Sequence, residues 1–460
     1  MRALPLLLLV ASLARAEAPV AGLLVGHTTH DRVRINVRTA GPGEGTLEIV
    51  GPDGKARPVP YATTEERANR AVVDIDGLSP RAPYTLRQGG SAVGSVRTMP
   101  APGAAAPLRI GFGSCLVPQA ERAPVMRHDG REEIENHLVW KHLASQEFDA
   151  WLWIGDRFYL PGLHEQFEAA GEGEVRRTFW MLQDALFAVP GVAPFSRRTP
   201  SYVIWDDHDY GPNNASGHFA GKGIALDVLR DGFANPPMGE GGVGGCSFRI
   251  TLGQIDLFLL DDRWHRECAA LKRALPDGRE VHSCTPDVER RPDGTWHAPK
   301  PLGAMYGEKQ MAWLRDGLTA SKATFKVVVG GNQMLSDIHR FEAWYQFEER
   351  GRFLAWLKEE RVPGVVFVSG DRHHGEIGVL REGGPYPLYE ITSSGLGAVV
   401  YPLDEDTPES PYDVIGGKGS VQNYGVLEYD PAGGGVLTLR LVGPDGAELA
   451  AHAVRAEDLR

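Results

Sequence analysis

Six apolar runs in this chain end in residues that can bind a metal ion or move a proton. The run Trp151–Ile154 is followed by Gly155, by Asp156 and, three residues later, by Tyr159. The other five runs end in the stretches GSC at 113–115, DDHD at 206–209, DDR at 261–263, GNQ at 331–333 and SGDRHH at 369–374. In α/β proteins the carboxyl ends of the strands line the functional crevice. We therefore expect these polar residues to lie close together.

Such a gathering of carboxylates indicates a metal site. Unpaired carboxylates repel one another and raise one another's pKa, and a bound cation relieves both effects. The ligands on offer exceed one coordination sphere, so more than one cation fits. Taken singly, an Asp after a strand is an ordinary helix N-cap or turn residue. For Asp261, Asp262 and Arg263 a structural ion pair remains a serious alternative. Turn formation does not explain the whole set, because turns need neither His nor Cys.

The elements that position these motifs differ along the chain. Residues 23–98 contain short alternating runs, such as Val33–Val37 and Ala71–Ile75, that predict strands with one wet face and a small β-sandwich. Leu78, Pro80 and Tyr84 resemble the corner of fibronectin type III domains.

After the linker-like segment 99–107, apolar runs alternate with helical patterns, such as Glu308–Leu314 and Phe353–Leu357. This alternation predicts an α/β domain of stacked sheets. The last strands, near 436–442 and 448–454, are expected to complete one of these sheets. The predicted division is a signal peptide at 1–16, a fibronectin III-like domain at 17–102 and a catalytic domain at 103–460.

The order of the motifs resembles that of the alkaline phosphatase D branch of the calcineurin-like metallophosphoesterases. The resemblance covers most of residues 108–460, and its specific parts are WDDHDYGPNN at 205–214 and SGDRHH at 369–374. The first D-x-H of the wider superfamily is missing, and in the D branch a cysteine takes its place. The resemblance implies a four-layer αββα sandwich that hydrolyses phosphate monoesters, diesters or both by attack of a metal-bound hydroxide.

The resemblance also implies the metal ligands. Asp156 would bridge two cations, and Tyr159 and Cys115 would bind Fe³⁺, although a Tyr159 ring packed on the strand end is the simpler alternative. Ca²⁺ prefers carboxylate and amide oxygens, and Zn²⁺, Mn²⁺ or Co²⁺ in place of these ions stays open. The Ca²⁺ ligands would be Asp206 or Asp207 with Asn213 or Asn214, and the last motif would add Asp371 and His373.

Further residues are implied in catalysis and substrate binding. His208 would protonate the leaving group. Arginines suit phosphate because their forked donors match its oxygens, but each arginine here could instead neutralise a neighbouring Asp. Position 157 is asparagine in many relatives, so Arg157 is a departure. The implied catalytic residues are His208, Arg157 and Arg263, and the implied substrate contacts are Arg372, His374 and Asn332.

The N-terminus predicts an exported protein. Arg2, the apolar run Leu4–Val10 and the small residues Ala14 and Ala16 form a signal peptide with cleavage before Glu17, so we expect a periplasmic or secreted location. The apolar run is too short to span a bilayer. In that oxidising setting the predicted disulfide joins Cys268 and Cys284.

Composition limits the partners. The chain has 460 residues and a formal net charge of -12, which disfavours binding to nucleic acid through phosphate neutralisation. We expect a small phosphoester substrate, no nucleic-acid surface, no membrane span and no obligate protein partner. Two rival functions stay open, a phospholipase D-type phosphodiesterase and a non-catalytic protein that binds a wall polymer.

Overall fold

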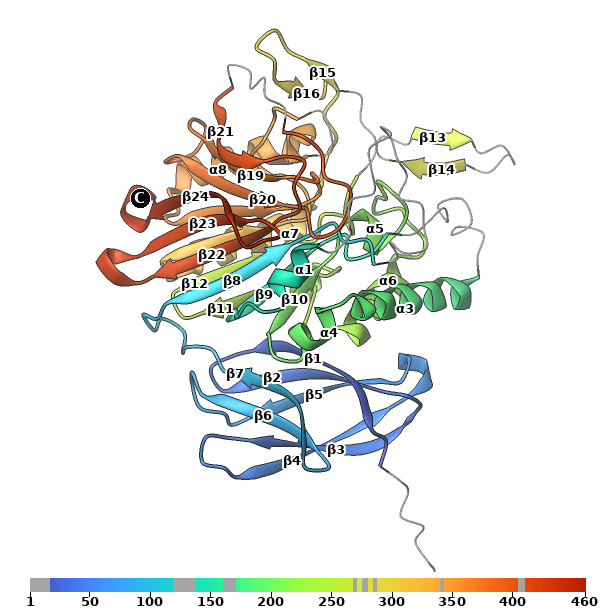
Figure 1. Cartoon of the computed structure of the whole chain (residues 1–460). Helices are drawn as coiled ribbons and strands as arrows, with labels where there is room; N and C mark the ends of the chain where they lie inside the picture. The colour runs from blue at the N-terminus through green and yellow to red at the C-terminus, as the bar shows by residue number, and fades with distance from the viewer. Residues whose placement is uncertain are drawn as a thin grey trace, which may run out of the picture.

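The computed structural model describes residues 17–118, 138–159, 171–267, 288–339, 343–403 and 410–460, with the backbone of two further strands, β13 (Leu271–Ala274) and β14 (Glu280–Ser283). Figure 1 shows a small N-terminal part made of strands, in blue, beside a larger part that contains both strands and helices. The described residues therefore include nearly all the predicted site.

The N-terminal part is an antiparallel β-sandwich, as predicted. One sheet has the order β1-β2-β5 and the other the order β4-β3-β6-β7. Because successive side chains on a strand point to opposite faces, Val33, Ile35 and Leu47 are fully buried between the sheets. The backbone N–H of Ser79 donates to Tyr84 Oη at 2.8 Å, across the predicted corner. The strands are β1 (Val20–Thr28), β2 (Arg32–Thr39), β3 (Gly43–Val50), β4 (Ala56–Thr63), β5 (Arg70–Asp76), β6 (Pro83–Gln88) and β7 (Ser91–Arg97).

The larger part begins with a six-stranded sheet of order β10-β9-β8-β22-β23-β24. Strands β8, β9 and β10 are parallel, and β22, β23 and β24 continue the sheet in antiparallel fashion. The two predicted final strands are thus confirmed. The bounds are β8 (Leu108–Gly113), β9 (Ala150–Ile154), β10 (Ser201–Ile204), β22 (Tyr424–Asp430), β23 (Val436–Val442) and β24 (Glu448–Arg455).

A seven-stranded sheet of order β11-β12-β17-β18-β20-β19-β21 lies against the first. The rings of Phe325 on β17 and Tyr429 on β22 are 5.9 Å apart, which marks the contact between the sheets. The bounds are β11 (Phe248–Leu252), β12 (Ile255–Leu259), β17 (Phe325–Val329), β18 (Val365–Ser369), β19 (Gly375–Leu380), β20 (Leu388–Ser393) and β21 (Tyr412–Lys418). A short hairpin, β15 (Glu289–Arg290) and β16 (Trp296–His297), stands apart.

Helices pack on both sheets. Trp140 of α1 stacks on Trp153 of β9, with ring centres 5.4 Å apart, and Trp313 of α7 meets Phe258 of β12 at 6.0 Å. Apolar strands buried on both faces are what such layering requires. The four-layer sandwich is therefore confirmed. The helices are α1 (Leu138–Leu143), α3 (Glu172–Ala188), α4 (Val192–Ser196), α5 (Asp207–Tyr210), α6 (Lys222–Gly232), α7 (Glu308–Ala320) and α8 (Glu348–Glu360).

Polar contacts join the two parts of the molecule. Tyr202 Oη of β10 accepts from the Thr28 backbone N–H at 3.1 Å, and Asn36 Nδ2 donates to the Asp231 carbonyl at 2.7 Å. Gly26 lies so near Ala234 that a Cβ at position 26 would sit 2.3 Å from the Ala234 carbonyl oxygen. This close approach fixes the sandwich against the larger part.

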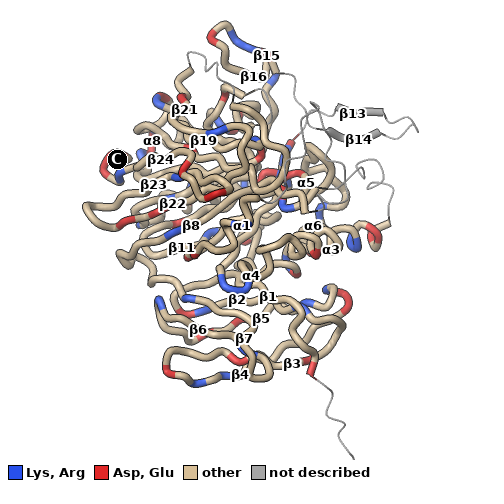
Figure 2. Tube along the Cα trace, in the orientation of Figure 1, with Lys and Arg blue, Asp and Glu red and all other residues tan. Residues whose placement is uncertain are grey.

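Several predictions fall outside the described residues. These are the signal peptide at 1–16 and the disulfide between Cys268 and Cys284, and the boundary at 102/103 stays a prediction. The described cysteines, Cys115 and Cys246, are buried thiols. None of the helices in the described ranges has the length and hydropathy that a membrane span needs. Figure 2 shows acidic and basic residues interspersed along the trace of both parts.

Candidate metal centre

The candidate centre is built from residues that follow the ends of parallel strands. Cys115 lies two residues beyond β8, Asp156 lies two residues beyond β9, and Asp371 and His373 follow β18. All four have left-handed backbone conformations, with φ angles of 61°, 51°, 67° and 55° respectively. Residues other than glycine rarely adopt this conformation, and where they do so the surrounding structure must hold them in place. Such strained positions cluster at functional sites.

Four predicted ligands meet around one carboxylate oxygen. Asp156 Oδ2 lies 3.1 Å from Tyr159 Oη and 3.6 Å from Cys115 Sγ. Tyr159 Oη also lies 3.0 Å from Nε2 of His373. Ligand atoms of Cys115, Asp156 and His373 all fall within 4.8 Å of one another, which is close enough to share one ion. The structure thus brings Cys115 and Tyr159, which the resemblance assigned to iron, together with Asp156 and His373.

His373 is prepared to act as a ligand through Nε2. Its Nδ1 lies 2.5 Å from the Val399 carbonyl oxygen, and a carbonyl can only accept, so Nδ1 carries the proton. Burial lowers the pKa of His373 to about 4, so the ring is neutral at pH 7. The Nε2 lone pair therefore faces Tyr159 and Asp156, and a hydrogen bond at the other nitrogen is typical of metal-binding histidines.

A second group of acids adjoins the first through the same Asp156. Ligand atoms of Asp156, Asp207 and His208 lie within 4.8 Å of one another, as do those of Asp156, Asp206 and Asp371. The backbone N–H of His208 donates to Asp156 Oδ1 at 3.2 Å and to Asp207 Oδ1 at 2.9 Å. Asp156 thus lies between two sets of ligands, where a bridging carboxylate would stand.

The two asparagines predicted beside these acids differ in position. The backbone N–H of Asn214 donates to Asp207 Oδ2 at 2.7 Å, and Asn214 is left-handed with a φ angle of 57°. Asn213 is exposed. Asn214 therefore contacts the acidic group through its backbone.

The buried acidic groups of the centre would be stabilised in their charged forms by bound cations. Burial, with Asp207, Asp209 and Asp371 nearby, raises the pKa of Asp156 well above its usual value. Burial and the Asp156 charge likewise raise the pKa of the Cys115 thiol and of the Tyr159 phenol well above their usual values. A bound metal reverses this preference and stabilises the deprotonated ligands. The donor set, a thiol, a phenol, an imidazole and several carboxylates, fits a site of more than one ion.

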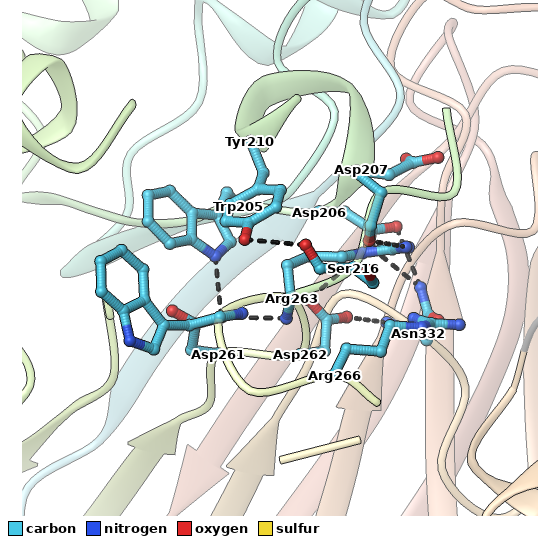
Figure 3. Close-up of polar contacts among 12 residues, drawn as sticks. Trp205, Asp206, Asp207, Tyr210, Ser216, Asp261, Asp262, Arg263, Arg266 and Asn332 are labelled. Atoms are coloured by element: carbon cyan, nitrogen blue, oxygen red, sulfur yellow. Dashed lines mark hydrogen bonds and ion pairs between the residues drawn. The ribbon is translucent and has the colours of Figure 1, made fainter. Parts of the chain in front are cut away.

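Figure 3 shows a buried polar network beside this centre. Arg263 is fully buried, and its Nε donates to Asp206 Oδ1 at 2.6 Å. Asn332 Nδ2 donates to both oxygens of Asp206, at 3.1 and 3.0 Å, and Arg266 donates to Asn332 Oδ1 at 3.1 Å. The Arg263 guanidinium also lies 3.8 Å from Asp262 Oδ1. The geometry therefore favours the ion-pair alternative for Arg263, and the Asn332 side chain is hydrogen-bonded to Asp206.

Two further predicted site residues, Arg157 and His374, form hydrogen bonds with carboxylates of the protein. Arg157 is buried, and its Nε donates to Asp209 Oδ2 at 2.6 Å while the guanidinium lies over the Phe233 ring. His374 is buried, with Nε2 3.1 Å from Glu376 Oε2. For Arg157 the ion-pair alternative is again favoured, and the prediction that His374 contacts substrate is not supported by its position. Arg372, also largely buried, lies close enough to His373 for its charge to lower the pKa of that ring.

Some buried charged residues near the centre were given no role in the sequence analysis. Asp209 accepts from the Asp206 backbone N–H at 2.7 Å and completes a capping box at the start of α5. The D-x-x-D spacing within DDHD is a signal that would have predicted this cap. His339 pairs with Glu376 at 2.8 Å across 37 residues of sequence. No local motif reveals that pairing.

Comparisons with known proteins agree with this geometry. Residues 237–407 match the family model described as PhoD-like phosphatase. Alkaline phosphatase D of Bacillus subtilis (strain 168) is 25% identical over 342 residues, which cover 66% of this chain and 53% of that protein. The chain thus spans about half the length of this curated relative.

Two solved structures share the fold. The structure of PhoD matches with a TM-score of 0.69 and 16% identity, over 97% of this chain and 92% of that one. Purple acid phosphatase PPD1 from yellow lupin seeds matches with a TM-score of 0.60 and 13% identity, over 94% of this chain and 73% of that one.

The fold and the acid-rich strand ends define a metallophosphoesterase-type sandwich with a candidate metal centre. Residues 237–407 match the PhoD-like phosphatases, and the chain is similar to alkaline phosphatase D over two thirds of its length. The resemblance read from the strand-end motifs is thereby confirmed.

Proposed function

We propose that the chain is an exported, metal-dependent phosphoesterase that hydrolyses small phosphate esters. The observation that carries the proposal is the convergence of Cys115, Tyr159 and His373 on Asp156, with further acids on its other side. The family match and the name of the curated relative support the same reaction class.

The proposed ions are Fe³⁺ and Ca²⁺. Cys115, Asp156, Tyr159 and His373 would hold the ferric ion, because a thiolate and a phenolate suit a highly charged cation. The oxygen donors of Asp206, Asp207, Asn214 and Asp371, with Asp156, would hold Ca²⁺. When bound, such ions lower the pKa of water and neutralise charge on phosphoryl oxygens.

The remaining roles belong to side chains of the chain itself. The His208 ring lies 4.2 Å from the Tyr159 ring and is half-buried, so it can meet a substrate held at the centre. We assign it the transfer of a proton to the leaving oxygen. Arg372 is the proposed contact to the phosphate oxygens, because it directly precedes His373 and its forked donors match those oxygens.

The test of the reaction class is hydrolysis of p-nitrophenyl phosphate and bis-p-nitrophenyl phosphate by the purified chain. We expect hydrolysis that a chelator abolishes and that added Ca²⁺ and Fe³⁺ restore. A preference for the diester would favour the phosphodiesterase alternative over the monoesterase. Folded, metal-loaded protein that cleaves neither ester would contradict the proposal and favour the polymer-binding alternative.

The iron assignment has its own test. A phenolate or thiolate on Fe³⁺ gives a ligand-to-metal charge-transfer band in the visible range, and neither Ca²⁺ nor Zn²⁺ gives one. Tyr159→Phe keeps the ring but removes the oxygen, so the band should shift or vanish, and Cys115→Ser should change the same band. A colourless, active enzyme that holds only divalent ions would reject iron and leave the phosphoesterase proposal standing.

Export is tested by the mature N-terminus. The signal peptide predicts that protein recovered from outside the cytoplasm begins near Glu17. Recovery of full-length chain from the cytoplasmic fraction alone would reject this part of the proposal.

A further inference from the structure

We propose that His339, His374 and Glu376 form a second metal site, for one structural Zn²⁺ or a similar divalent ion. The site shares no residue with the centre at Asp156, and it does not depend on the proposed phosphoesterase activity. His339 follows β17 by ten residues, His374 follows β18, and Glu376 is the second residue of β19. The three residues thus come from two segments that are far apart in the sequence, the stretch after β17 and the start of β19.

The geometry of the three donors matches a shared cation. Nε2 of His339 lies 2.8 Å from Glu376 Oε2, and Nε2 of His374 lies 3.1 Å from the same oxygen. The ring centres of the two histidines are 5.2 Å apart, and the three ligand atoms all fall within 4.8 Å of one another. Ligands about 2.0–2.1 Å from a tetrahedral Zn²⁺ stand roughly 3.3 Å apart. Small outward shifts of the side chains would therefore admit the ion.

Burial and chemistry both favour a transition metal over Ca²⁺. His339, His374 and Glu376 are at most 3% exposed. Two imidazoles and one carboxylate are the donors that Zn²⁺ takes in proteins, whereas Ca²⁺ needs six to eight oxygens. The single carboxylate charge, with two neutral imidazoles, would balance part of the charge of a divalent cation.

Neighbouring side chains hydrogen-bond the Glu376 carboxylate, as the residues behind the ligands of a metal site usually do. Tyr412 Oη donates to the second oxygen of Glu376, Oε1, at 2.7 Å, and Gln333 Nε2 approaches the same oxygen at 3.4 Å. Gln333 is fully buried, and among the described residues its Oε1 has no hydrogen-bond partner. A buried amide oxygen without a partner is costly unless a ligand or water meets it. Within the described part of the chain, Gln333 thus has an unpaired acceptor on the side chain that contacts the shared carboxylate.

The ion would serve to position the catalytic centre. His374 follows His373 directly, and His373 is held in a left-handed conformation with a φ angle of 55°. A metal that ties His374 to the β17–α8 segment through His339 would help to maintain that conformation. The competing explanation is a trio in which both imidazoles simply donate to Glu376, and the two explanations differ in metal content.

The experiment is Zn²⁺ binding to the chelator-treated full chain, measured by elemental analysis after removal of free metal. It is done in the wild-type background and in an Asp156→Ala background, in which the first centre is weakened. In both backgrounds His339→Asn should remove one Zn²⁺ per chain. His30→Asn, in the N-terminal sandwich, is the matched control and should remove none. Co²⁺ in place of Zn²⁺ should give visible absorption that His339→Asn abolishes.

Equal Zn²⁺ content with and without His339 in chains of equal near-ultraviolet circular dichroism would overturn the proposal. Glu376→Gln keeps the size of the side chain and decides the matter if the His339 variant misfolds, because it too should lose the ion. The Asp156→Ala chain alone gives a third readout, since Zn²⁺ should raise its melting temperature. No rise would also overturn the proposal, whatever the ester assay gives.

Discussion

A substitution of the His208 side chain can test proton transfer to the leaving group without disturbing metal binding. Its contacts to Asp156 and Asp207 are made by the backbone N–H, which a change of side chain leaves in place. We predict that His208→Gln keeps the metal content but lowers kcat by about 10²–10⁴-fold, the usual contribution of a general acid. The loss should be larger for an alkyl phosphate than for p-nitrophenyl phosphate, because nitrophenolate leaves without a proton. Equal losses for both esters would argue against the assigned role.

The sequence allowed the positions of the candidate ligands to be predicted better than the partners of the arginines. Cys115, Asp156 and Tyr159 stand at fixed short distances from strand ends, so local sequence predicts where they point. Arg263 pairs with Asp206 across 57 residues, and that pairing exists only once two sheets have been stacked. Its full burial could not be predicted from a motif in which arginine and aspartate are neighbours.

The turn after β9 fixes how the central carboxylate is presented. Gly155 has a φ angle of 103°, and a Cβ at that position would lie 2.5 Å from Asp206 Cβ. We predict that Gly155→Ala destabilises the protein by about 2 kcal/mol or more, through the backbone strain and the clash. Hydrolysis and metal content should fall as well, since both Asp206 and Asp156 would shift. Urea unfolding and elemental analysis measure the two effects.

Gly223 of α6 provides the matched control for that substitution. A Cβ at position 223 meets nothing within 4 Å. Alanine favours a helix over glycine by up to about 1 kcal/mol, so Gly223→Ala should be neutral or slightly stabilising. A Gly155→Ala variant as stable and as active as Gly223→Ala would show that the turn does not constrain the site.

Strands and helices with a strong pattern could be predicted, and short irregular elements could not. The apolar runs at 151–154, 325–329 and 365–368 are buried on both faces, so their composition alone marks them as strands. The helical patterns near 308 and 353 belong to α7 and α8. The four-residue α5 depends on its capping box and on neighbours from other elements, which composition does not reveal.

The junction between the sandwich and the larger part makes the stability of the whole molecule sensitive to pH. His27 on β1 faces the Tyr202 ring of β10 at 5.9 Å, and burial together with the Arg34 charge lowers the His27 pKa to about 4. The unfolded chain binds this proton below about pH 6.5 while the folded chain does not, so acidification between pH 6.5 and pH 4 favours unfolding.

The size of this effect can be measured by comparison with a variant that does not titrate. At pH 5 the His27 contribution should destabilise the wild type by about 1–2 kcal/mol relative to pH 7.5. His27→Gln removes this proton linkage, so its melting temperature should fall less over the same interval. Parallel curves for the two proteins would show that His27 titrates normally in the fold.

Asp156 is the residue on which both the proposed metal centre and the proposed hydrolysis depend. Asp156→Asn preserves the shape of the side chain but removes its charge, and metal content and p-nitrophenyl phosphate hydrolysis are then measured on the same samples. The wild type should contain metal and hydrolyse the ester. The variant should be folded, contain less metal and turn over at least about a thousandfold more slowly, as expected when several kcal/mol of charge stabilisation are lost. Wild-type turnover with unchanged metal content in the variant would contradict the bridging role of Asp156.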